Sequence, residues 1–110
     1  MAATVSPPFV TTEAVLTEVA NALSRQRFRK LGVITLSNIF HTPDIEIVSV
    51  DSVLFNRAFT LYATHSDKNW GLTDCISFVV MKERHITAVL TTDHHFIQAG
   101  FTSIIHNTRS

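Results

Sequence analysis

Three acidic side chains, Glu18, Asp74 and Asp93, have the chemistry needed to hold a divalent cation. Carboxylate oxygens are hard ligands that suit Mg²⁺ or Mn²⁺, and these ions commonly bridge between protein carboxylates and phosphate. A bound ion of this kind lowers the pKa of a coordinated water and stabilises charge on a phosphodiester during in-line attack. Because clustered carboxylates repel one another, a cation would also hold them together. The chemistry on offer is metal-assisted hydrolysis of a phosphodiester.

Each of these acids also has a purely structural explanation. Asp74 near the start of a helix gains from the helix macrodipole, although its neighbours on the helical wheel are apolar, where an unpaired carboxylate is costly. Asp93 could shape a turn through its side chain, and Glu18 could be a surface residue of a helix. Without further information the three acids are therefore only a weak signal of a metal site.

The stretch from Asp67 to Phe101 supplies the elements that position two of the acids. Thr73 is expected to cap a helix that begins at Asp74 and continues to Arg84. Apolar side chains surround this helix almost completely, so it should be buried on most sides. A short apolar strand, Ile86–Leu90, follows, and Asp93 lies just after its carboxyl end. In open α/β sheets ligands bind at that end of the strands.

Two segments of this stretch, DKNWGLTDC at 67–75 and LTTDHHFIQAGF at 90–101, resemble the C-terminal half of a PIN domain, the nuclease fold of VapC-type toxins. The segment FVTTEAVLTEVANAL at 9–23 resembles, more weakly, the family's second strand and its Glu-bearing helix. The family usually carries another Asp on a first strand, which has no counterpart in these residues. The resemblance implies a PIN-like three-layer α/β/α fold with a mainly parallel sheet that lacks the N-terminal strand.

The same resemblance implies a metal-dependent endoribonuclease that cleaves RNA and is restrained by a cognate antitoxin protein. Its catalytic and metal-binding residues would be Asp74, Asp93 and Glu18, with Mg²⁺ or Mn²⁺ as cofactor. Two further residues are candidate accessories. The hydroxyl of Thr92 could orient a metal-bound water, or Thr92 is an ordinary strand-end residue. Asp67 could add another acid, or it simply forms a turn before Lys68.

A non-catalytic alternative stays open beside the ribonuclease. A truncated PIN-fold remnant could act as a protein-binding module, for an antitoxin or for self-association. The strand without a counterpart is central in the family's sheet, and its loss would leave backbone polar groups unpaired or force its neighbours to pair directly. We therefore expect a homo-oligomer.

The remaining pattern alternates strands with helices, which favours one mainly parallel α/β sheet. Gly32 and the β-branched residues after it weaken the second of the expected helices. The expected elements are a short strand at Phe9–Val10, helices at Glu13–Arg25 and Leu31–Phe40, a strand at Ile45–Val50, a helix at Val53–Ala63, a short segment at His94–Ala99 and a strand at Thr102–Ile105.

Four cations, Arg25, Arg27, Arg29 and Lys30, lie within six residues. They could contact phosphate groups. They could instead be the solvated end of the helix expected at Glu13–Arg25, where cations complement the negative end of the macrodipole. From the sequence we favour the second explanation.

Composition predicts a single cytoplasmic domain over residues 1–110, with an extended lead-in at 1–8 and a frayed tail at 106–110. Nine basic and nine acidic residues balance, so net charge favours neither nucleic acid nor membrane. No apolar run approaches the ~20 residues of a membrane span, and no signal peptide is evident. The single cysteine, Cys75, excludes an internal disulfide and is expected to be a packed core thiol.

Other catalytic classes lack their signatures. The three glycines are scattered, which argues against a phosphate-binding glycine-rich loop, and no nucleophile elbow is present. His94 and His95 are adjacent and lack the spacing of a known metal motif, so we do not expect a catalytic histidine. Trp70 and Phe96 are expected to be core or interface anchors.

Overall fold

The computed structural model describes residues 8–91 and 93–103 and divides the chain after Val50 into an N-terminal and a C-terminal unit. Each unit is described by itself. Residues 1–7 and 104–110 lie outside the described residues, as do almost all of the expected lead-in, the whole expected tail and the end of the last expected strand. A single domain over residues 1–110 stays a prediction.

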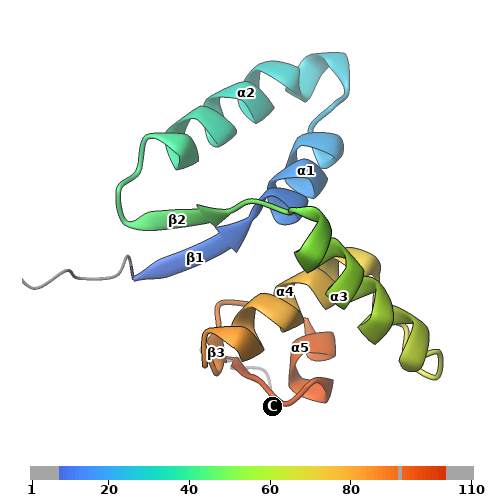
Figure 1. Ribbon diagram of the computed structural model, residues 1–110. Helices are drawn as coiled ribbons and strands as arrows, with labels where there is room; N and C mark the ends of the chain where they lie inside the picture. Colours follow the sequence, from blue (N-terminus) through green and yellow to red (C-terminus); the bar gives the residue numbers. More distant parts are fainter. Residues whose placement is uncertain (1–7, 92, 104–110) are drawn as a thin grey trace, which may run out of the picture. The chain divides into compact units, whose positions relative to one another are not determined.

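The N-terminal unit is a pair of parallel strands joined through two helices (Figure 1). Strand β1, Phe9–Thr12, pairs with β2, Ile45–Val48, so that Phe9 lies opposite Ile45. Parallel strands need a long crossover connection. Helices α1, Glu13–Ala22, and α2, Gln26–Phe40, supply it.

Two side chains fix the start of α1. The hydroxyl of Thr12 accepts the backbone N–H of Val15 at 3.2 Å, as an N-cap residue does. The carboxylate of Glu13 accepts the backbone N–H of Val50 at 2.8 Å, which joins the start of α1 to the segment after β2. Thr12 is therefore the N-cap residue of α1.

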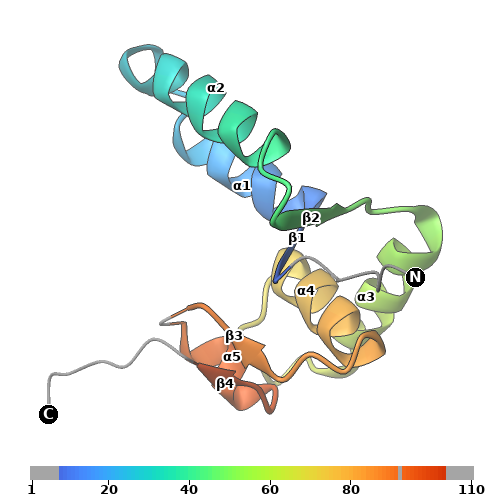
Figure 2. The same ribbon diagram turned by 90° about the vertical axis from the view of Figure 1, so that its left-hand side faces the viewer.

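The helix predicted at Glu13–Arg25 ends earlier, at Ala22, and α2 begins at Gln26 rather than at Leu31. The hydroxyl of Ser24 donates to the carbonyl of Ala20 at 2.7 Å, which satisfies a carbonyl at the end of α1. Figure 2 shows α1 and α2 running side by side.

Gly32 explains how closely these two helices pack. It is the buried residue of α2, and a Cβ at this position would lie 3.2 Å from the Cβ of Leu23. A glycine that weakens a helix in isolation thus allows a close approach to Leu23 here, where a Cβ would be tightly packed. The contact with Leu23 explains why Gly32, considered from the sequence alone, weakened the prediction of this helix.

The C-terminal unit holds three helices and a second parallel pair of strands. The side chain of Asp51 accepts the backbone N–H of Leu54 at 2.8 Å and caps the first helix. That helix buries Leu54 and Ala58 and packs on the next one (Figure 1). The elements are α3, Ser52–Thr64; α4, Leu72–Glu83; β3, Ala88–Val89; α5, His94–Gln98; and β4, Thr102–Ser103.

An aromatic cluster forms the core of the C-terminal unit. The ring of Phe78, on α4, is fully buried. It meets Trp70 edge-on at 5.0 Å, Phe96 of α5 edge-on at 4.9 Å, and Phe101 at 5.7 Å between ring centroids. Each such pair adds about 0.5–1.5 kcal/mol beyond its burial. The cluster therefore holds α5 against α4, and Trp70 is the core anchor that the sequence predicted.

The predicted α/β fold with parallel strands is confirmed. Where the sequence suggested one sheet, the described strands form one parallel pair in each unit. The strand predicted at Ile86–Leu90 is shortened to Ala88–Val89, because only these two residues pair with β4. No helix in the described part of the chain is long and apolar enough to cross a membrane.

Candidate functional site

Asp74 is anchored at the start of α4. The predicted cap, Thr73, is wrong, because α4 begins at Leu72 and Gly71 occupies the N-cap position. Asp74 is the third helical residue, and its Oδ2 accepts the backbone N–H of Gly71 at 3.1 Å. An acid at this position can reach back to the cap amide and is stabilised by the positive end of the helix.

Asp74 also lies in a largely apolar setting, as the helical wheel predicted. Its side chain is only 22% exposed. The next residue, Cys75, is fully buried. Burial first, and the charge of Asp74 second, raise the pKa of the Cys75 thiol. The thiol therefore stays protonated near neutral pH and is the core thiol that the sequence predicted.

Asp93 is anchored at the start of α5. Its Oδ1 accepts the backbone N–H of His95 at 2.9 Å, and its own N–H donates to the hydroxyl of Thr91 at 3.0 Å. Asp93 thus shapes the turn from β3 into α5, as an N-cap residue does. With 41% of its side chain exposed, it also remains accessible to a ligand.

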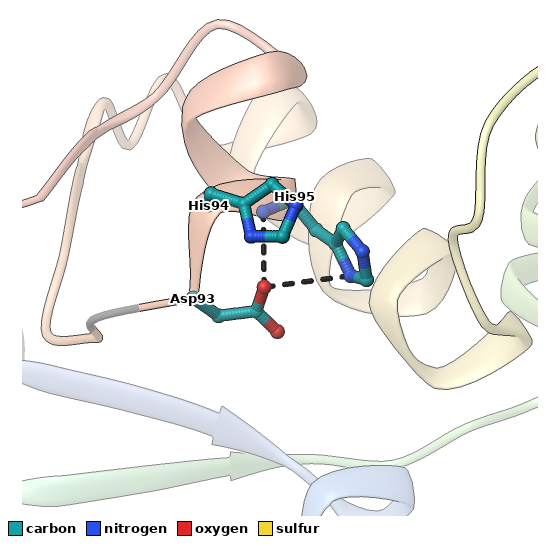
Figure 3. Close-up of side chains that lie close together, drawn as sticks. All are labelled: Asp93, His94 and His95. Carbon is teal, nitrogen blue, oxygen red and sulfur yellow. Dashed lines mark hydrogen bonds and ion pairs between the residues drawn. The ribbon is translucent and has the colours of Figure 1, made fainter.

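His95 brings the two acids together. Its Nδ1 lies 3.3 Å from Oδ2 of Asp74 and 3.4 Å from Oδ1 of Asp93. Figure 3 shows the carboxylate of Asp93 facing this imidazole, whereas His94 is exposed. The Nδ1 atom is buried and makes no hydrogen bond of good geometry with any described residue. A buried nitrogen without a partner, set between two carboxylates, marks a position that a cation would fit.

The carboxylate oxygens of the two acids that make no hydrogen bond with the described residues suit a divalent ion. Oδ1 of Asp74 and Oδ2 of Asp93 make no hydrogen bond with the described residues. Asp93, His94 and His95 could each also offer one ligand atom, all within 4.8 Å of one another. Carboxylate oxygens suit Mg²⁺ or Mn²⁺, and imidazole nitrogens suit transition metals.

The described contacts do not join the other predicted residues to Asp74, Asp93 and His95. Glu18 is exposed on α1, in the N-terminal unit, and makes no hydrogen bond or ion pair with the described residues. The carboxylate of Asp67 is 71% exposed and lies 3.4 Å from the ammonium of Lys68, as the turn interpretation predicted. Thr92 lies outside the described residues.

His95 is the residue that the sequence analysis missed. His94 and His95 were not expected to be site residues, because they are adjacent and lack the spacing of a known metal motif. One signal was available: an Asp that caps a helix accepts the amide of the second or third helical residue. His95 is the second helical residue after Asp93, so its backbone had to lie beside that carboxylate.

Comparison with known proteins finds a matching family model and matching solved structures. A family model of the PIN domain matches residues 2–102. The crystal structure of Mycobacterium tuberculosis VapC20, described as a toxin that cleaves the sarcin-ricin loop, superposes with a TM-score of 0.78 at 26% sequence identity. That match covers 87% of this chain and 74% of the VapC20 chain. The comparison with curated proteins found no match.

Proposed function

The chain belongs to the PIN domain family, and on that premise we propose that it is a metal-dependent endoribonuclease of the VapC toxin type. One observation carries the proposal: Asp74 and Asp93 both lie within 3.4 Å of Nδ1 of His95. Two carboxylates this close together repel each other unless a positive group lies between them. A divalent ion would supply that charge.

Asp74 and Asp93 would hold Mg²⁺ or Mn²⁺ through their oxygens that lack hydrogen bonds. Nucleases of this family generally use divalent metals. When bound, the ion would supply an acidified water and stabilise charge on the phosphodiester. Glu18 is the third proposed ligand, on the resemblance of its segment to the family's Glu-bearing helix alone.

The protein's own contribution is to fix the two carboxylates in advance. The amide of Gly71 fixes Asp74, and the amide of His95 fixes Asp93. The His95 imidazole then faces both acids. Side chains that are already held by hydrogen bonds lose little freedom when they bind an ion, which favours a tight and specific site.

RNA is the proposed substrate, and an antitoxin protein is the proposed partner. VapC20 is described as cleaving the sarcin-ricin loop, so an RNA hairpin of that loop is the first substrate to try. The aromatic residues Phe55, Phe59 and Tyr62 are exposed on α3. They offer apolar surface for a protein partner, whether an antitoxin or a second copy. Thr92 and Asp67 remain candidate accessory residues.

Cleavage of that hairpin during Mg²⁺ and Mn²⁺ titrations tests the proposal. Asp74→Asn and Asp93→Asn keep the side-chain shape and remove the charge. Loss of a group that only orients metal ligands lowers activity by up to about 100-fold, so loss of a ligand carboxylate should lower the cleavage rate by at least that factor. Asp44→Asn is the matched control, because Asp44 is exposed in the N-terminal unit. Cleavage without metal, or equal cleavage by all variants, would refute the proposal and favour a protein-binding remnant.

A further inference from the structure

A basic patch, formed by Arg25, Arg27, Arg29 and Lys30, lies at the start of α2. Arg25 is the N-cap residue, and the other three follow within the first two turns. All four side chains are exposed. Arg25 and Arg27, together with Gln26, line a shallow hollow of the surface.

This position reverses the explanation that the sequence favoured. The sequence placed these cations at the carboxyl end of a helix, where they would complement the macrodipole. In the structure α1 ends at Ala22 and has no basic residue in its last turn. The cations instead lie at the amino end of α2, which is the positive end. There they repel the helix dipole and one another.

Nothing in the described chain neutralises the patch. Helix α2 has no acidic residue in its first turn and no side-chain cap. No ion pair joins the four cations to a described carboxylate. Arg29 donates to the carbonyl of Ser24 at 2.8 Å, and the guanidinium of Arg27 lies 4.7 Å from the centre of the Phe28 ring. Neither contact removes positive charge, so the patch is an electrostatic cost to the isolated protein.

We propose that the basic patch binds the phosphate backbone of RNA, an inference that rests on the proposed ribonuclease function. The forked guanidinium of arginine matches phosphate oxygens, and free N–H groups at the start of a helix also favour anions. The whole chain is neutral and therefore exerts no long-range attraction on a polyanion. Four of its nine positive charges are gathered here, which gives the chain a local surface that RNA can contact.

RNA affinity in the presence of EDTA tests this inference without any cleavage. The probe is a fluorescently labelled single-stranded oligouridine, and the readout is anisotropy over a range of salt concentrations. Arg27→Gln combined with Lys30→Gln removes two charges of the patch. Lys68→Gln combined with Lys82→Gln removes the same charge from exposed positions of the C-terminal unit and is the matched control.

We expect the patch variant to bind more than about 10-fold more weakly, and its slope of log affinity against log salt to fall by roughly 1.4, since each lost phosphate contact on a single strand contributes about 0.7. The control should change neither. Unchanged binding by the patch variant, or an equal loss in the control, would overturn the inference. So would polyglutamate that competes as well as unlabelled oligouridine, because the patch would then suit an acidic protein segment.

Thermal melting of the same variants gives a second readout. Removal of cations from the positive end of α2 should leave the melting temperature unchanged or raise it. A melting temperature below that of the wild type would show that the cations stabilise the fold, which contradicts the inference. Failure of the cleavage experiment would leave this binding result standing, and loss of patch binding would leave cleavage standing, so the two proposals fail separately.

Discussion

Among single residues His95 has an unusual place, because its buried Nδ1 faces two acids. A neutral imidazole nitrogen either accepts or donates a hydrogen bond, and only the donating form suits a carboxylate. The His95 side chain therefore helps to set the distance between the carboxylates of Asp74 and Asp93, which a bound metal would have to span.

Replacement of His95 by Ala should weaken Mn²⁺ binding about 10–100-fold, the usual effect of losing a group that orients metal ligands. Isothermal titration calorimetry measures this affinity directly. His41→Ala is the matched control, because His41 is exposed in the N-terminal unit and is not among the proposed ligands. Equal affinities of the two variants would show that His95 does not position the acids.

Cys75 gives a second prediction at this scale. Burial and the charge of Asp74 raise its pKa above the ordinary value of 9.0 in the folded state. The unfolded chain therefore loses this proton at lower pH than the folded chain, and the free energy of unfolding must fall as pH rises above about 9. One proton is worth at most about 1.4 kcal/mol per pH unit.

Urea unfolding between neutral and alkaline pH tests this dependence. The wild type should lose stability more steeply with rising pH than Cys75→Ala, whatever the absolute cost of that substitution. Parallel pH profiles for the two proteins would contradict the assignment. Cys75 is the only cysteine, so no other thiol contributes to the difference.

The residues were only partly predictable from the sequence. Asp74 and Asp93 could be proposed because their types, spacing and flanking segments resemble the PIN family. His95 could not, since the direction of its ring depends on how α5 packs against α4. That packing is a long-range property, and local pattern does not contain it.

At the scale of elements, the aromatic cluster around Phe78 determines how close the two acids come. Phe78 lies one turn after Asp74 on α4, and Phe96 lies next to His95 on α5. The edge-on contact between these two rings at 4.9 Å therefore sets the position of α5 against α4. The geometry of the proposed site therefore depends on this core as well as on the two acids.

Phe78→Leu should lower the free energy of unfolding by about 1–3 kcal/mol, because a fully buried ring is replaced by a smaller side chain of different shape. Phe59→Leu is the matched control, since Phe59 is 52% exposed and should change stability by no more than about 0.5 kcal/mol. Chemical denaturation measures both. Equal effects of the two substitutions would rule out the cluster as the core.

Element boundaries followed a similar division between local and long-range causes. The starts of α1 and α3 were predicted to within a residue, because the capping side chains Thr12 and Asp51 lie in the sequence just before them. The start of α2 at Gln26 was missed, because residues 13–25 were assigned to a single helix and the break after Ala22 was not recognised. A capping side chain can be recognised in the sequence, whereas contact between two helices cannot.

At the scale of the whole molecule, a neutral chain separates its charges. Acids are brought together beside His95 in the C-terminal unit, and cations gather at the start of α2 in the N-terminal unit. Total charge, which is all that composition reports, hides this separation. A metal-dependent ribonuclease needs both kinds of local charge, one for the ion and one for the RNA backbone.

Whether Asp74 and Asp93 hold a metal can be tested by locating a bound Mn²⁺ ion through its paramagnetic effect on amide signals in an NMR spectrum of the isotope-labelled protein. Signals close to the ion broaden first. We expect the signals of Gly71, Asp74, Asp93 and His95 to broaden at the lowest Mn²⁺ concentrations, and Asp74→Asn and Asp93→Asn each to abolish the effect. Broadening centred elsewhere, or persisting in both variants, would contradict the claim that these two acids hold the metal.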